Sequence, residues 1–352
     1  MAEAIFWIAL GCTAYVYAGY PLLLLAWQWW DRRPVRKQYH EPSVSLVIAM
    51  HNERNHVQLK LQNCFELDYP PDKLQVIVSL DAPTDDTEAL VREYAGKGVE
   101  VVCSSVHLGK AEALNSGVAI ATGEIVLFAD SRQMFDKRAV RELVANFADA
   151  SVGAASGELV LLDEQGKETS DAAGAYWRYE KGLRGMESGI HSVPGATGAI
   201  YAIRRELFAP LAAGTILDDV VIPMRIVLAG KRVVFDSTAR AYEVASRNAS
   251  SEYERKIRTL AGNYQLIVQM PALLAPWRNR IFVQFISHKL GRLLVPYCLV
   301  ALFVSNLFLL HGLYLVAMLG QMVWYSLAGA GWLASAHQSV VPAAPSAEAR
   351  KE

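Results

Sequence analysis

The sequence predicts an α/β protein, in which a doubly wound mixed sheet is flanked by transmembrane helices, one N-terminal and two C-terminal. Strand patterns alternate with helical patterns in the middle of the chain, as is typical of doubly wound sheets with a parallel core. Long apolar stretches lie at both ends of the 352-residue chain. Its net charge of −1 argues against a nucleic-acid-binding protein, because that class normally carries a basic excess.

The N-terminal apolar stretch, Ala4 to Trp30, contains no charged residue. It exceeds the roughly 20 residues that span a bilayer, so residues 1–30 are expected to form a transmembrane helix. The stretch is too long for a signal peptide. A basic linker, residues 31–42, follows it, and the positive-inside bias places this end in the cytoplasm. The domain expected at residues 43–270 is therefore cytoplasmic.

The C-terminal apolar stretches, Leu293 to Leu310 and Leu313 to Ala334, are separated only by a His-Gly pair. They predict a transmembrane hairpin over residues 293–334. Residues 271–292 mix cations with large apolar side chains, as an amphipathic helix lying at the membrane interface would. A buried core helix is the alternative for that segment. Residues 335–352, rich in Ala, Pro and Ser, predict a disordered tail.

The middle of the chain begins with buried strands, each followed by a helical pattern or a turn. The predicted strands are Ser43–Met50, Leu74–Leu80, Val99–Cys103 and the run from Glu124 that ends at Asp130. Helices are predicted over Glu88–Tyr94 and Ala111–Ala121. The first strand is not followed by the glycine-rich turn that a dinucleotide site needs, which weighs against an NAD enzyme.

The second half of the middle region is predicted to be more varied. Residues Ser151 to Leu162 suggest two short strands or a hairpin, and Ala172 to Gly189 suggest a helix. A glycine-rich segment then leads into a strand that ends at Arg204 and Arg205, since glycines allow close backbone approach. A helix is expected to follow, running to Ala229.

Polar side chains collect where the predicted parallel strands end. They are Asn52, Glu53, Asp81, Lys110 and Asp130. Ligands of open α/β sheets bind at the carboxyl ends of strands, so these residues predict a site. For Asp130, the alternative is that it caps the helix expected near residues 137–149.

Charged residues in the second half also have two interpretations. Asp218 and Asp219 begin the predicted helix, where adjacent carboxylates often serve only as caps. Arg255 and Arg258 share a face of the helix after Ser250, where they could form a solvated surface. A carboxylate within hydrogen-bond reach of a hydroxyl can also act as a general base, and cations can stabilise a charged leaving group.

Taken in order, these residues resemble the family 2 glycosyltransferases with a GT-A fold, particularly membrane-embedded bacterial members related to polysaccharide synthases. The resemblance covers roughly residues 43–269. Its motifs lie at Ile48–Glu53, Asp81–Thr87, Leu108–Asn115, Asp130–Arg132, Gly198–Arg204 and Asp218–Asp219. The motifs are individually short, and their order and spacing give the resemblance its specificity.

The resemblance implies a role for each motif. The implied donor-binding residues are Asn52, Glu53, Asp81, Lys110, Asp130, Arg132, Arg255 and Arg258. The implied acceptor side comprises Gly198, Tyr201 and Arg204, and the implied catalytic pair is Asp219, as general base, with Asp218. Asp130 is the implied metal ligand, for Mg²⁺ or Mn²⁺.

Two departures from the family pattern bear on mechanism. Arg132 stands where the third position of the DxD motif usually carries a carboxylate, so either Asp130 binds the cation with other help or Arg132 partly replaces it. The QxxRW signature of processive synthases is represented only by Glu254–Thr259, without Gln or Trp. Processive addition is therefore an open alternative to single addition.

The expected function is inverting transfer of a sugar from a nucleotide-sugar, a UDP-sugar first, to a growing glycan or lipid-linked acceptor in envelope or exopolysaccharide synthesis. The expected location is the bacterial inner membrane, with membrane lipid and other subunits of an export complex as partners and no nucleic acid. The alternatives are a polyprenyl-phosphate sugar transferase and a non-catalytic subunit of a synthase complex. Retention of Asp81, Lys110 and Asp219 argues against the non-catalytic subunit.

Overall fold

The computed structural model describes residues 1–163, 165–169, 172–244 and 249–338. The chain divides into two compact units. The larger unit comprises residues 20–245 and 259–290, and the smaller comprises residues 1–19, 246–258 and 291–352. All of the β-structure lies in the larger unit, within the described residues.

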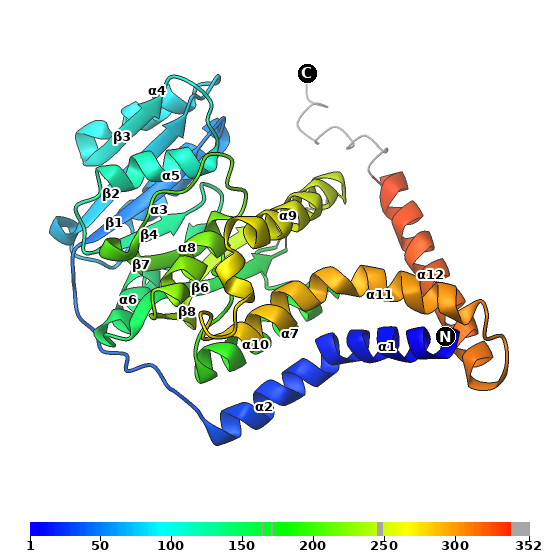
Figure 1. Ribbon diagram of the computed structural model, residues 1–352. Coiled ribbons are helices and arrows are strands. Elements are labelled where there is room, and N and C mark those ends of the chain that lie inside the picture. The colour runs from blue at the N-terminus through cyan, green and yellow to red at the C-terminus, as the bar shows by residue number, and fades with distance from the viewer. Residues whose placement is uncertain (164, 170–171, 245–248, 339–352) are drawn as a thin grey trace, which may run out of the picture. The chain divides into compact units, whose positions relative to one another are not determined.

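The strands of the larger unit form one mixed sheet, in the order β3-β2-β1-β4-β7-β6-β8-β5 among the described residues (Figure 1). Their bounds are β1 Val44–Met50, β2 Leu74–Asp81, β3 Val99–Ser104, β4 Ile125–Ala129, β5 Met134–Phe135, β6 Val152–Leu162, β7 Ile200–Arg204 and β8 Arg232–Val244. Strands β3, β2, β1 and β4 are parallel, and β7 runs antiparallel to β4. The predicted mixed sheet with a parallel core is confirmed.

Helices cover both faces of this sheet. Successive side chains of each buried strand point to opposite faces, so apolar side chains on both faces pack against helices. The helices of the larger unit are α2 Tyr20–Trp30, α3 Arg54–Phe65, α4 Thr87–Arg92, α5 Lys110–Ala119, α6 Ala139–Ala145, α7 Ala172–Ile190 and α8 Asp218–Leu228. In β1, Leu46 and Ile48 face the core shared with α3 and α6, whereas Val47 faces the core shared with α5 and α8. Gly117 of α5 lets that helix lie close to β1, since an added Cβ would fall 2.6 Å from Val47 Cγ1.

Two strands differ from the sequence-based expectation. The segment from 152 to 162, expected as two strands or a hairpin, is the single strand β6, which carries an irregularity between Ser156 and Glu158. Gly157 is at that irregularity because the β8 backbone comes so close that an added Cβ would lie 2.5 Å from the carbonyl oxygen of Ala239. Strand β8, which pairs with β6, was not anticipated.

The segment 271–292 also differs from expectation, because it is not one amphipathic helix lying on a surface. It contains a 3₁₀ turn (Pro271–Leu274), the short α10 (Phe282–Gln284) and a π-helical turn (Phe285–Leu290). Asn279 is 1% exposed and donates a hydrogen bond to the carbonyl of Leu273. Buried polar groups need such partners, so part of this segment packs inside the larger unit, and its position at a membrane interface stays a prediction.

His288 ties the π-helical turn to α7 and α2 within the larger unit. Its Nδ1 lies 2.8 Å from Glu187 Oε1, and its Nε2 lies 3.0 Å from Glu180 Oε1. The Tyr20 hydroxyl donates to the same Glu187 oxygen at 2.6 Å. These contacts fix the turn in place and explain why its polar side chains point inward.

The smaller unit is built mainly from helices. It contains α1 (Ala2–Ala14), the π-helical turn Tyr15–Gly19, part of α9 (Ala249–Gln269), α11 (Gly291–Asn306) and α12 (Gly312–Gln338). Phe6 and Ala9 of α1 pack with Leu302 and Leu309. Helix α12 continues past the expected end of the hairpin at Ala334, and residues 339–352 of the expected tail lie outside the described residues.

Three helices have the length and apolar composition needed to cross a membrane, among the residues that the structure describes. They are Ala2–Trp30, Phe282–Asn306 and Gly312–Gly331. The prediction of one N-terminal and two C-terminal spans is confirmed at this level. The first C-terminal span begins at Phe282, earlier than the expected Leu293.

Candidate active site

The carboxyl ends of three parallel strands meet at one edge of the sheet. Strand β1 pairs with β2 up to Met50 and Leu80, and with β4 up to Ile48 and Ala129. The residues that follow these strands, among them Asp130, therefore lie along the same edge. Asn52 and Ala82 adopt positive φ angles of 51° and 44° there. Such strained backbone in non-glycine residues tends to occur at functional sites.

Lys110 joins two of the carboxylates at this edge. Its Nζ donates a hydrogen bond to Asp130 Oδ1 at 2.7 Å and lies 3.3 Å from Asp218 Oδ1. Asp130 is therefore not the cap of α6, and Asp218 is bound by side chains rather than serving only as a helix cap. The sequence motifs that contain these three residues are far apart, and the fold brings them together.

Tyr201 holds the other oxygen of the buried Asp218. Its hydroxyl lies 3.3 Å from Asp218 Oδ2, and its ring stacks on Phe128 with a centroid distance of 4.7 Å. Tyr201 is 0% exposed, and burial followed by the charge of Asp218 raises the pKa of its hydroxyl. Tyr201 is thus a positioning residue for Asp218, and its enclosed side chain does not face an acceptor.

Asp219 is the more accessible carboxylate of the pair. Its Oδ2 accepts a hydrogen bond from the Gly198 amide at 3.1 Å, and its carbonyl accepts one from Ala196 at 2.7 Å. A Cβ added to Gly198 would lie 3.4 Å from Asp219 Oδ2 and 3.7 Å from Asp130 Oδ2. Both carboxylates therefore border the same small space beside Gly198.

The environment of Asp219 favours its protonated form more than water would. Desolvation, and then the negative charge of Asp218, raise the pKa of Asp219 to about 6, although Lys110 and Lys289 oppose the shift. A carboxylate with a pKa near neutrality accepts a proton more readily than an ordinary aspartate does. This property suits a general base.

We expect the rate of sugar transfer to fall as the pH drops below about 6, because protonated Asp219 cannot accept a proton. The acid limb of this pH profile reports the titration of Asp218 and Asp219 as a coupled pair, not of one residue alone. The measurement is kcat/KM from acidic to neutral pH for a donor that does not itself titrate. A flat profile across that range would contradict a role for Asp219 as base.

Asp81 anchors the loop that leads into α5. Its Oδ1 accepts a hydrogen bond from the Leu108 amide and its Oδ2 accepts one from the Gly109 amide, both at 2.8 Å. Gly109 has a φ of 91°, in the left-handed region that glycine adopts without strain. His107 also contacts Asp81 Oδ2, at 2.9 Å. Asp81 thereby positions the amino end of α5 and Lys110.

Replacing Asp81 with alanine should weaken nucleotide-sugar binding, because two backbone amides lose their acceptor and the loop before Lys110 loosens. Each unsatisfied buried group costs roughly 1–3 kcal/mol, so we also expect a lower melting temperature. Titration calorimetry with the donor and a thermal melt measure the two effects. Unchanged donor affinity in a folded Asp81→Ala protein would remove Asp81 from the donor site.

Asn52, Glu53 and Arg132 lie on the β1 side of this edge. Asn52 Oδ1 accepts a hydrogen bond from the Thr84 amide at 2.7 Å, so it joins the loops after β1 and β2. Glu53 Oε1 lies 3.9 Å from Arg132 Nε. The Arg132 side chain is 52% exposed. Arg132 thus faces Glu53 and retains most of its donors for a ligand.

Arg204, one of the three other arginines predicted for the site, is not part of this cluster. Arg204 pairs with Ile125, at the opposite end of β4 from Asp130, because β7 runs antiparallel. Its guanidinium donates to the carbonyls of Val152 and Phe147 instead. Arg255 and Arg258 are exposed residues of α9 that belong to the smaller unit.

Two lysines approach the site without having been predicted as site residues. Lys60 of α3 is 0% exposed and donates a hydrogen bond to the Gln133 carbonyl at 2.6 Å, which holds the loop after Asp130. Lys289 Nζ would lie 3.5 Å from a Cβ on Gly195, a residue with a φ of 145°. Neither lysine belongs to a recognisable motif, so only the fold identifies them.

Asp130 presents a carboxylate oxygen that could take part in holding a divalent cation. Its Oδ2 accepts no hydrogen bond among the described residues, and its side chain is 33% exposed. Three carboxylates, Asp130, Asp218 and Asp219, surround the single ammonium of Lys110. Hard cations prefer such oxygen ligands, so the residues fit the expected metal. A second group, His51, Asp81 and His107, has ligand atoms within 4.8 Å of one another.

Residues 45–211, which include β1 through β7 and most of this site, match the family model described as glycosyl transferase family 2. The chain carries a family 2 glycosyltransferase domain. Asp218 and Asp219 lie just beyond the matched residues. The enzyme class predicted from the motifs is therefore confirmed.

Two relatives of this glycosyltransferase domain extend the comparison. Probable glycosyltransferase YdaM of Bacillus subtilis is 25% identical over 309 residues, covering 80% of this chain and 70% of that protein. Poly-β-1,6-N-acetyl-D-glucosamine synthase of Staphylococcus aureus is 22% identical over 237 residues, covering 64% of this chain and 56% of the synthase. The matched region thus spans just over half the length of the synthase.

A solved structure shows the same fold. Mannosyltransferase PcManGT from Pyrobaculum calidifontis, in complex with GDP-mannose and Mn²⁺, aligns with a TM-score of 0.73 at 24% identity. The alignment covers 93% of this chain and 92% of that chain. The predicted GT-A fold of the glycosyltransferase domain is confirmed.

Proposed function

We propose that this protein is a membrane-bound, inverting glycosyltransferase that moves a sugar from a nucleotide-sugar to a glycan acceptor. The observation that carries the proposal is the link that Lys110 makes between Asp130 and Asp218, beside the accessible Asp219. In one small space, Lys110 supplies a cation for a leaving diphosphate and Asp219 supplies a base for an incoming hydroxyl. The relationship to a polysaccharide synthase supports a glycan as the acceptor.

The chemistry assigns a separate task to each side chain. Asp219 accepts the proton of the acceptor hydroxyl, whose oxygen then bonds to the anomeric carbon. The bond from that carbon to the nucleoside diphosphate breaks, and the bonding electrons leave with the diphosphate. Attack opposite to the leaving group inverts the anomeric carbon. Lys110 stabilises the negative charge that develops on the diphosphate.

Asp130 holds the divalent cation in this proposal, with Mg²⁺ or Mn²⁺ as the candidates. A cation bound there supplies further stabilisation of the leaving diphosphate. The mannosyltransferase that shares this fold contains Mn²⁺ together with its nucleotide-sugar. Arg132, on the Glu53 side, is placed to bind an anionic group of a ligand through its planar guanidinium.

The three apolar helices anchor the protein in the bacterial inner membrane, with the domain of residues 43–270 facing the cytoplasm. The basic residues after the first span support this orientation. A cytoplasmic site has access to UDP-sugars, which we propose as the first donors to test. Product analysis then separates the candidate functions. A larger glycan supports the proposal, whereas a lipid-extractable monosaccharide would instead indicate a polyprenyl-phosphate sugar transferase.

A further inference from the structure

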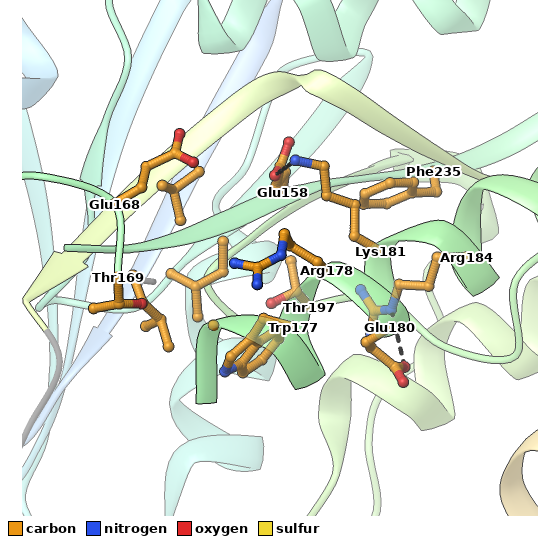
Figure 2. Close-up of a pocket in the computed structure, with 14 residues that line it drawn as sticks. Glu158, Glu168, Thr169, Trp177, Arg178, Glu180, Lys181, Arg184, Thr197 and Phe235 are labelled. Atoms are coloured by element: carbon orange, nitrogen blue, oxygen red, sulfur yellow. Dashed lines mark ion pairs between the residues drawn. The ribbon is translucent and has the colours of Figure 1, made fainter. Parts of the chain in front are cut away.

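A pocket lined by Thr197, the residue before Gly198, lies within the larger unit (Figure 2). Strand β6 contributes Glu158, helix α7 contributes Trp177, Arg178 and Lys181, and Thr197 lies on another side. The mechanism above gives none of these side chains a task. Their combination of an indole ring, a guanidinium and a carboxylate is typical of pockets that orient a small polar ligand.

Glu158 places a nearly buried carboxylate in the wall of this pocket. Its side chain is only 8% exposed, and one carboxylate oxygen pairs with Lys181. The other oxygen, Oε2, is buried and has no hydrogen bond among the described residues; its nearest cation is Arg240 Nε, at 3.8 Å. Because Oε2 is itself enclosed, the polar group of this wall that a ligand can reach is Lys181, whose side chain is 42% exposed.

Arg178 supplies the complementary donors. Figure 2 shows its guanidinium within the pocket, near Trp177 and Thr197. No ion-pair partner of Arg178 is found in the described part of the chain, whereas Lys181 pairs with Glu158 and Arg184 pairs with Glu180. The charges of the pocket balance, since its lining includes three carboxylates and three cations: Glu158, Glu168, Glu180, Arg178, Lys181 and Arg184. This balance favours an uncharged ligand that both donates and accepts hydrogen bonds.

The pocket adjoins the acceptor side of the catalytic centre. Thr197 lines it, and the next residue, Gly198, donates its amide to Asp219. The loop anchored by Asp81 does not contribute to the pocket. A ligand in the pocket would therefore be joined to the part of the acceptor that carries the attacking hydroxyl. It would not be part of the donor nucleotide.

We propose that this pocket is an acceptor subsite that binds an uncharged sugar residue of a glycan, beyond the residue that carries the attacking hydroxyl. The sugar ring stacks on Trp177, while its hydroxyls accept hydrogen bonds from Arg178 and Lys181. This inference rests on the proposed function, because only a glycosyltransferase has a glycan acceptor. It also specifies the acceptor class, a glycan of more than one sugar.

The test measures binding without any donor. Purified full-length protein in detergent is titrated with neutral gluco- and N-acetylgluco-oligosaccharides, from disaccharide to pentasaccharide, and with an oligomer of a uronic acid as the anionic probe. Trp177→Ala and Arg178→Ala should each bind the best neutral oligosaccharide at least about tenfold more weakly, because they remove the stacking surface and the charged donor. Trp177→Phe should retain part of the affinity.

Matched controls separate the subsite from general effects. Trp277→Ala and Arg92→Ala change exposed residues that do not line the pocket, and both should bind as the wild type does. Failure of the wild type to bind any neutral oligosaccharide, preference for the anionic probe, or unchanged affinity in folded Trp177→Ala and Arg178→Ala would overturn the subsite. Failure of transfer with every donor would overturn the proposed function and leave this binding result unaffected.

Discussion

Asp219→Asn should reduce sugar transfer by roughly 10²–10⁴-fold, the contribution that a positioned general base typically makes. Asparagine has nearly the same size and keeps an oxygen that can accept the Gly198 amide, so the local structure should persist. Donor affinity should remain nearly unchanged, because Asp219 is assigned to the acceptor hydroxyl. Single-turnover transfer and donor titration measure the two quantities.

Asp68→Asn provides a matched control, since this exposed carboxylate pairs with Arg141 away from the site. It should transfer sugar as the wild type does. The acid limb of the pH profile should also disappear from the residual activity of Asp219→Asn. Activity of that variant within about tenfold of wild type would rule out Asp219 as the base.

Removal of divalent cations should stop the reaction, and Mg²⁺ or Mn²⁺ should restore it. A diphosphate leaving group carries more negative charge than one guanidinium neutralises, and Lys110 is already shared by Asp130 and Asp218. Asp130→Asn should lose activity at all but high cation concentrations. The activity of Arg132→Ala should still depend on the cation, and any decrease in activity should come from weaker ligand binding.

The measurement is transfer by chelator-treated protein, followed by titration with each cation. Full turnover in excess chelator, combined with loss of activity in Arg132→Ala, would contradict the assignment of Asp130. That pair of results would make Arg132 the principal group that neutralises the diphosphate.

The parallel half of the sheet was predictable because its strands are buried on both faces and their apolar runs end sharply. The run from Ile125 to Ala129 is the clearest case, since every residue in it is buried. Strand β8 was missed because Asp236, Ser237 and Thr238 interrupt its apolar pattern. Asp236 is nevertheless buried, where Lys37 and Asn146 satisfy it. Local patterns do not reveal such distant partners.

Strand direction explains why one site prediction was misplaced. The sequence around Arg204 identifies a strand, but not that the strand runs antiparallel to β4 and carries Arg204 away from Asp130. The segment 271–292 is a similar case, because an interfacial helix and a buried turn can have the same composition. Tertiary contacts, such as those of His288 with Glu180 and Glu187, are what reveal that the turn packs against α7.

The central claim is that Lys110, Asp130, Asp218 and Asp219 form the centre of a sugar-transfer reaction. Its most direct test is nucleotide release by the purified protein in detergent, screened across nucleotide-sugars with a glycan acceptor present. We predict that one donor gives acceptor-dependent release of nucleoside diphosphate, and that Asp219→Asn abolishes it. Acceptor-dependent release at equal rates in wild type and Asp219→Asn, or no release from any donor by the folded wild-type protein, would contradict the claim.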